Sequence, residues 1–178
     1  MLNFGEVNLW ALERQDLGDH YRWANDDSLR RLAGFPPEPR SMIQLEAWFA
    51  QLQSDPSQLV YSAKDCQARM LGWVHLHDID RRNGSASVGL VIDEQYWRQG
   101  YGYQALAAVT IHAFDDLRLA RLESEVLSMN RPSRALFEKI GFCHEGTKRQ
   151  AQYTAGRRLD VEIYGLLALE FEWPARPT

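Results

Sequence analysis

The chain has 178 residues, of which 45% are hydrophobic and 25% charged, as in soluble globular proteins with one sizeable core. A net charge of −4 argues against non-specific nucleic-acid binding, and no run approaches the roughly 18 apolar residues that a membrane span needs. The N-terminal residues lack the features of a signal peptide, and the two cysteines, Cys66 and Cys143, fit neither a disulfide framework nor a zinc pattern. We therefore expect a cytoplasmic protein.

Hydrophobic periodicity and turn residues predict the secondary structure in chain order. The first half is expected to hold a strand over 7–12, helices over 16–25, 26–32 and 41–52, and strands over 59–63, 70–78 and 85–92, the last two as a hairpin. The second half is expected to hold a helix from the glycines at 100 and 102 to about 117, a strand over 122–127, a short helix between Pro132 and Gly141, and two strands, from Phe142 and over 159–169. This order predicts a mixed α/β protein with helices on both sides of a central sheet.

Two glycines, Gly100 and Gly102, stand where the predicted strand over 85–92 gives way to a helix. Glycine lets the backbone approach a ligand closely, and the first N–H groups of a helix have no partners within it. Arg98 adds a positive charge beside them. The stretch therefore predicts a binding site for a phosphate or pyrophosphate.

Three phosphate ligands compete for this stretch. A P-loop is excluded because its Lys-Ser/Thr pair is absent. A dinucleotide-binding fold fits the bare pattern of Gly100, Gly102 and Ala105, with Glu123 about 20 residues further on. Seven residues separate the strand from Gly100, however, where that fold has a tight turn, so the dinucleotide reading is the weaker one. The third ligand is the pyrophosphate of coenzyme A.

Three segments in the right order and spacing carry a resemblance to a known family. They are Tyr96-Trp97-Arg98-Gln99-Gly100-Tyr101-Gly102, then Asn130-x-x-Ser133-x-x-x-Phe137-Glu138-Lys139-Ile140-Gly141-Phe142, and Gly156-Arg157-Arg158-Leu159-Asp160-x-x-x-Tyr164. The chain resembles the GNAT N-acetyltransferase superfamily, in the branch that acetylates ribosomal-protein N-termini and spermidine. The resemblance implies one GNAT domain over 1–173 with a tail at 174–178. It also implies a mostly antiparallel twisted sheet with one splayed strand pair and acetyl-CoA held in the splay.

The resemblance also implies which residues hold the cofactor. The backbone of Val91 and Ile92 would bind the pantetheine arm and the thioester carbonyl. The loop would hold the pyrophosphate through Arg98, Gln99, Gly100, Tyr101, Gly102 and Tyr103. Asn130 would bond to the pantetheine, or serve as a helix cap, or both. Ser133, Phe137 and Lys139 would line the cofactor side of the last helix, and Asp160 and Tyr164 would order the last hairpin near the acceptor.

The implied reaction is direct attack of an amine on acetyl-CoA, which needs a proton acceptor and a proton donor. The family commonly has a glutamate and a tyrosine for these tasks, and this chain has Ser87 and Phe137 at those positions. Either positioning and a water chain suffice, or another residue acts. His75, which alternates with Trp73 and His77 along one strand, is the candidate base beside Ser87. No third ligand accompanies the two histidines, so we expect no metal site.

The sequence thus predicts an acetyl-CoA-dependent N-acetyltransferase acting on a small-molecule or peptide amine, as a homodimer. A non-catalytic acyl-CoA-binding regulatory protein is the alternative that the absent glutamate and tyrosine favour, and a dinucleotide-binding oxidoreductase is the more distant one. The acceptor stays open, and the residues that decide it are expected at 26–56 and in the last hairpin. Within the first region, the proline-rich segment 34–39 either borders the substrate or is a plain connection. Asp93 and Glu94 either attract a cationic amine or form a solvated strand end.

Overall fold

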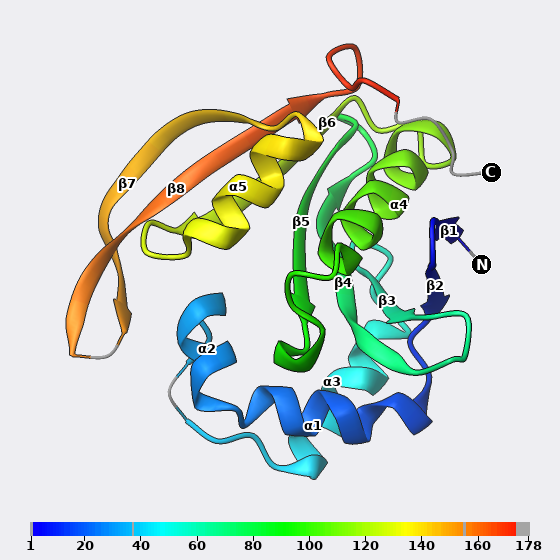
Figure 1. The fold of residues 1–178 in the computed structure, drawn as a ribbon, viewed down its shortest axis with the longest axis vertical. Coiled ribbons are helices and arrows are strands. Elements are labelled where there is room, and N and C mark those ends of the chain that lie inside the picture. The colour runs from blue at the N-terminus through cyan, green and yellow to red at the C-terminus, as the bar shows by residue number, and fades with distance from the viewer. Residues whose placement is uncertain (1, 37, 155, 174–178) are drawn as a thin grey trace.

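The computed structural model describes residues 2–36, 38–154 and 156–173, and its elements follow the predicted order (Figure 1). The strands are β1 (Leu2–Phe4), β2 (Val7–Ala11), β3 (Leu59–Lys64), β4 (Met70–Asp80), β5 (Ser85–Ile92), β6 (Arg121–Leu127), β7 (Cys143–Thr154) and β8 (Arg157–Leu167). The helices are α1 (Leu17–Ala24), α2 (Asp27–Ala33), α3 (Met42–Leu52), α4 (Tyr101–Asp115) and α5 (Arg131–Ile140). Short 3-10 turns, η1 (Arg14–Asp16) and η2 (Glu94–Tyr96), precede α1 and follow β5.

All eight strands form one sheet in the order β1-β2-β3-β4-β5-β6-β8-β7. Every neighbouring pair is antiparallel except β5 and β6, which run parallel because α4 crosses over between them. This topology confirms the predicted mixed α/β class with a mostly antiparallel sheet. It excludes the dinucleotide-binding alternative, because that fold requires a doubly wound parallel sheet.

Local signals in the sequence place the helix ends where the prediction had them. Asp26 caps α2 by accepting hydrogen bonds from the N–H groups of Ser28 and Leu29. Ser41 and Gln44 form a reciprocal capping box at the start of α3. At the end of α5, Gly141 adopts φ +113°, a left-handed conformation that glycine accepts without strain.

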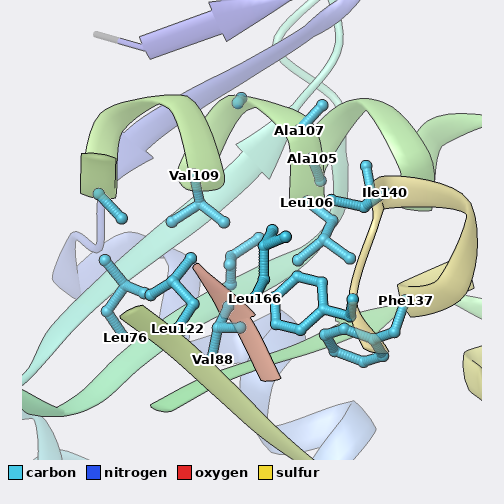
Figure 2. Packing of buried hydrophobic residues seen from close by; sticks show 14 of the residues in the cluster. Leu76, Val88, Ala105, Leu106, Ala107, Val109, Leu122, Phe137, Ile140 and Leu166 are labelled. Carbon is cyan, nitrogen blue, oxygen red and sulfur yellow. The ribbon is translucent and has the colours of Figure 1, made fainter. Parts of the chain in front are cut away.

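Helix α4 packs over one face of the sheet and forms the main core (Figure 2). Its Leu106 and Val109 are fully buried above side chains from four strands. Those strand residues are Leu76, Val88, Leu122 and Leu166, each at most 2% exposed. Helix α5 adds Phe137 and Ile140 to the same core, so α4 and α5 are fixed relative to each other.

The opposite face of the sheet is covered by the N-terminal helices. Trp23 of α1 is 2% exposed and packs with Leu29 of α2 and Val91 of β5. Trp73 of β4 packs against the same group, and His20 lies between Trp73 and Trp48 of α3. Helices therefore lie on both faces, as predicted. The predicted tail, 174–178, lies outside the described residues.

Two hydrogen bonds tie α2 to parts of the chain that are distant in sequence. The Asn130 side chain donates to the Leu32 carbonyl at 3.0 Å, and that of Gln152 donates to the Gly34 carbonyl at 3.1 Å. Helix α2 is thereby held beside α5 and the β7–β8 hairpin (Figure 1). Among the helices of the described part of the chain, none is both long and apolar enough to cross a membrane.

Candidate active site

The parallel strands β5 and β6 pair only at one end. The paired residues run from Ser85 and Arg121 to Ser87 and Glu123, after which the strands separate (Figure 1). Beyond Ser87, the edge of β5 that faces away from β4 has no partner on β6. A cavity of about 470 Å³, here called the cleft, lies in this opening between residues 88–91 of β5 and 123–127 of β6. The splayed strand pair is therefore present as predicted.

The loop after β5 leads into the first turn of α4. Arg98 and Gly100 adopt φ +60° and +85°, which turns the chain sharply into α4. Among the described residues, none accepts a hydrogen bond from the backbone N–H groups of 98–103, and no side chain caps α4. Such a concave row of N–H groups at the positive end of a helix binds anionic oxygen, and Arg98 adds a full charge. The loop therefore fits a pyrophosphate.

A second cavity of about 320 Å³ connects the cleft with this loop and shares Leu90, Val91 and Ser133 with the cleft. Most of the predicted cofactor residues line one or both cavities, namely Val91, Ile92, Arg98, Gly100, Tyr101, Gly102, Asn130, Ser133 and Phe137. The structure thus brings together three segments that are far apart in sequence.

Three predicted cofactor residues do not line these cavities with their side chains. The Gln99 amide donates to the Gln95 carbonyl at 3.0 Å, and Lys139 Nζ lies 4.8 Å from the ring centroid of Tyr103. For Gln99 and Tyr103 the predicted contact runs through the backbone N–H. The Lys139 side chain lies against Tyr103 of α4, and its contact with the cofactor stays a prediction.

Asn130 lines both cavities, and its side chain makes two hydrogen bonds within the protein. Its Oδ1 accepts a hydrogen bond from the Ser133 N–H at 3.2 Å, which caps α5, while its Nδ2 donates to Leu32. The helix-cap alternative is therefore realised. An additional bond to a pantetheine remains a prediction, since Oδ1 has a second lone pair.

The match to a known family decides what this cleft is. Residues 6–143 match the family model described as the acetyltransferase (GNAT) domain. The chain belongs to the GNAT acetyltransferase family. It is therefore an N-acetyltransferase with acetyl-CoA as co-substrate, which overturns the alternatives of an oxidoreductase and of a non-catalytic binding protein.

Individual relatives agree with this assignment. An uncharacterized N-acetyltransferase of the SPbeta prophage of Bacillus subtilis, YokL, is 29% identical over 83% of this chain and 82% of its own length. Spermidine N(1)-acetyltransferase of Vibrio cholerae is 25% identical over 93% of this chain and 95% of its own length. The crystal structure of Vibrio cholerae spermidine N-acetyltransferase with CoA and spermine superposes with a TM-score of 0.89 at 24% identity, covering 93% of this chain and 97% of that one.

Phe137, at the position where the family commonly has a tyrosine as general acid, lies in the hydrophobic core. Phe137 is 2% exposed and packs at 6.4 Å, between ring centroids, against Tyr164 of β8. The Tyr164 hydroxyl donates to Glu138 at 2.9 Å and accepts from Arg134 at 3.2 Å. Tyr164 thus links β8 to α5 and also packs on His144 of β7, with 5.5 Å between ring centroids, so the hairpin role that the resemblance implied stays a prediction. Asp160 does support that hairpin, by accepting from the Gln150 N–H at 2.7 Å.

A carboxylate, that of Glu123, lies beside Ser87, which stands where the family commonly has a glutamate. Ser87 lines the cleft, and its partner in the register of β5 and β6 is Glu123. Paired residues project from the same face of a sheet, and Glu123 lines the cleft as well. One oxygen, Oε1, accepts from Arg121 Nε at 2.7 Å. Sequence reasoning missed Glu123 in this role because only the strand register places it next to Ser87.

His75, the predicted base, lies on β4 opposite Gly89 of β5 and lines the cleft. Its Nε2 is 3.0 Å from Gln58 Oε1, so Nε2 carries the proton and Nδ1 the free lone pair. Burial, followed by the neighbouring His77, lowers the pKa of His75 to about 4. His75 is therefore a neutral but weak base at pH 7.

Asp93 was a candidate for attracting the amine, but the structure gives it a different role. Its carboxylate accepts from the Trp23 indole N–H at 2.8 Å and pairs with Arg22 at 2.6 Å. Burial opposes its ionisation, yet these bonds outweigh burial and lower the pKa of Asp93. Asp93 therefore connects α1 to the end of β5, and Arg22 already neutralises its charge. No group of three or more His, Cys, Asp and Glu within the described residues is placed to hold a metal.

Proposed function

We propose that this acetyltransferase moves the acetyl group of acetyl-CoA to a primary amine of a small molecule or peptide, by direct attack within a ternary complex. The observation that carries the proposal is the arrangement of three cavities. The cleft shares residues with the cofactor cavity on one side, and with a third cavity on the other through Phe35, Trp73 and His75. The second and third cavities share no lining residue, so two substrates can meet in the cleft without competing.

The cofactor end of the proposal follows from the loop and from β5. The N–H groups of 98–103 hold the pyrophosphate, and Arg98 balances its charge. The backbone of Val91 and Ile92, in the part of β5 that has no partner on β6, holds the pantetheine arm and the thioester carbonyl. An N–H that is fixed in a strand stabilises the oxyanion as charge develops on it.

The amine end needs an unprotonated nitrogen, although a free alkylamine has a pKa of about 10. The amine nitrogen adds to the thioester carbonyl, which forms the new N–C bond and the oxyanion. The C–S bond breaks as the oxyanion collapses, and the amine proton leaves through the cleft. We assign its removal to a water relay past the Ser87 hydroxyl to Glu123, with His75 positioning the amine through Nδ1. Phe137 cannot donate a proton, so the departing thiolate takes one from water.

An amine panel tests the proposal. Purified protein with acetyl-CoA is mixed with spermidine, an alanine-initiated peptide and a series of alkyl and aryl amines, and release of free thiol is followed. We expect at least one amine to raise thiol release above the hydrolysis background. Tight binding of CoA together with no stimulation by any amine contradicts the proposal.

Two broader features stay predictions from sequence. Both cysteines, Cys66 and Cys143, are exposed and free, which suits the reducing cytoplasm that we propose. The proposed homodimer is checked by light scattering on the purified protein.

A further inference from the structure

An aromatic pocket of about 240 Å³ adjoins the cleft on the side away from the cofactor. It lies between α1, α3, the segment after α2, and β4. Its walls include Trp23, Trp48, Trp73 and Phe35. Phe35 stacks on Trp73 with 6.2 Å between ring centroids and 9° between planes, at the boundary with the cleft. Phe35, Pro36 and Glu38 of the proline-rich segment therefore border this pocket.

The centre of the pocket wall is a histidine whose hydrogen-bonding capacity is unused. His20 of α1 is 4% exposed, and its ring centroid lies 5.6 Å from those of Trp23, Trp48 and Trp73. Among the described residues, none is within hydrogen-bonding reach of its buried Nε2. A buried polar atom without a partner is costly and uncommon in native proteins. The atom has almost no accessible surface in this structure, so a ligand in the pocket satisfies it only when a neighbouring side chain moves aside.

The charges around the pocket do not favour the binding of a further ammonium group, such as a polyamine carries in addition to the amine that reacts in the cleft. Asp16, which faces His20, is bound by Lys64 and Ser62 at 2.7 Å each. Asp93, behind Trp23, is bound by Trp23 and Arg22. On the rim, Glu38 and Arg40 have opposite charges. The interior therefore offers flat apolar surfaces and one neutral polar atom, because burial lowers the pKa of His20 to about 4.

We propose that the acceptor is an arylalkylamine, or a peptide whose first residue is aromatic, with a hydrogen-bonding group on its ring. The ring fills the aromatic pocket, its hydroxyl or N–H pairs with His20 Nε2, and its amine reaches the cleft past Trp73 and His75. This inference rests on the proposed acetyl transfer and adds the class of amine. A polyamine is the competing class of acceptor, and the same experiment distinguishes the two classes.

The experiment compares kcat/KM for tyramine, phenethylamine, cyclohexylethylamine and spermidine. We expect kcat/KM for the two aryl amines to exceed that for spermidine by about tenfold or more, because burying an apolar ring in the pocket stabilises the bound amine. Tyramine should exceed phenethylamine by about fivefold, the value of one net hydrogen bond. Equal rates for all four amines, or the highest for spermidine, overturn the inference while leaving acetyl transfer intact.

Two variants locate the effect. His20→Phe keeps the aromatic volume and should abolish the preference for tyramine over phenethylamine, measured as the ratio of the two kcat/KM values so that any change common to both amines cancels. Trp48→Leu removes a half-buried wall and should raise KM for both aryl amines without changing that of acetyl-CoA. Unchanged amine selectivity in both variants, with CoA affinity and circular dichroism preserved, would place the acceptor elsewhere.

A binding measurement separates failure of the inference from failure of the proposed function. Tyramine should quench tryptophan fluorescence of the CoA complex, and quenching should weaken in Trp48→Leu. Quenching without any acetyl transfer retains the pocket and contradicts the reaction. Acetyl transfer to other amines without quenching by tyramine retains the reaction and contradicts the pocket.

Discussion

Glu123 shows how much a single residue depends on its neighbours across a sheet. In the sequence it stands out only through its spacing from Gly100 in the dinucleotide-binding pattern, and nothing there marks it as a partner of Ser87. In the structure it is the partner of Ser87, so a carboxylate lies one strand away from the position where the family commonly has its glutamate. Arg121 holds one of its oxygens, which fixes the orientation of the group.

At this scale we predict that Glu123→Gln lowers kcat by about 10²-fold at pH 7, because removal of a general base typically costs that much. KM for acetyl-CoA should not change. The substitution leaves the fold intact, since Arg121 keeps its ion pair with Glu145. Steady-state kinetics across pH check the prediction, since the alkaline limb should recover part of the rate as more free amine becomes available.

Glu125 supplies the matched control. It follows Glu123 by two residues, lines the same cleft and pairs with Lys148. Glu125→Gln removes an equal charge from the same strand face, and we expect less than a threefold effect, about the scale of an exposed ion pair. A larger loss in Glu125→Gln than in Glu123→Gln would reverse the assignment.

At the scale of elements, the junction of β5 and α4 is the most demanding part of the fold. A Cβ atom added to Gly102 would lie 3.4 Å from Leu136 Cδ2 and 3.7 Å from Ile92 Cγ1. The first turn of α4 therefore packs closely against both α5 and β5, and any branched side chain there must project into the cofactor cavity.

We predict that Gly102→Val weakens CoA binding by at least about tenfold, equivalent to 1.4 kcal/mol, while the protein stays folded. Gly18→Ala is the control, because Gly18 lies in α1 with open space around it. Isothermal titration with CoA and thermal unfolding of both variants check the prediction. Wild-type affinity in folded Gly102→Val would remove this loop as the cofactor site.

Most elements could be predicted because their signals are local. The caps at Asp26 and Ser41, the glycines at 100 and 141 and the alternation of β4 all act within a few residues. Strand β1 was not predicted, since its three residues are too few to show a period. The face of α5 on which Lys139 lies could not be predicted, because it depends on how α5 packs against α4. The aromatic pocket was equally hidden, because the packing of α1, α3 and the segment between α2 and α3 against β4 forms it.

For the whole molecule, the buried histidine His20 couples stability to pH. In the unfolded chain histidine has a pKa near 6.5, and burial lowers the pKa of His20 to about 4 in the folded protein. The unfolded state therefore binds more protons between pH 6.5 and 4, and stability falls as the pH falls through that range. The contribution of His20 is about 3 kcal/mol when complete.

Urea unfolding between pH 7.5 and 4.5 measures this coupling. We expect His20→Phe to gain stability relative to wild type as the pH falls, because the variant has no proton to bind in the unfolded state at this position. Gly18→Ala, which changes no titratable group and lies on the same helix as His20, should leave the pH dependence as it is. Parallel pH curves for wild type and His20→Phe would show that His20 does not titrate as inferred.

The separation of the two outer cavities has a consequence for how such a protein can diversify. The aromatic pocket is built mainly from one stretch of chain, 20–48, whereas the cofactor cavity draws mainly on 90–136. A short block of the gene can therefore change, by substitution or exchange, which amine is selected, while the machinery for the acetyl donor is inherited unaltered. Within this stretch Leu29, Leu32 and Ala33 line the cofactor cavity and would have to be kept. Phe35, Trp73 and His75 line both the aromatic pocket and the cleft, so a change there affects the pocket and the place of reaction together.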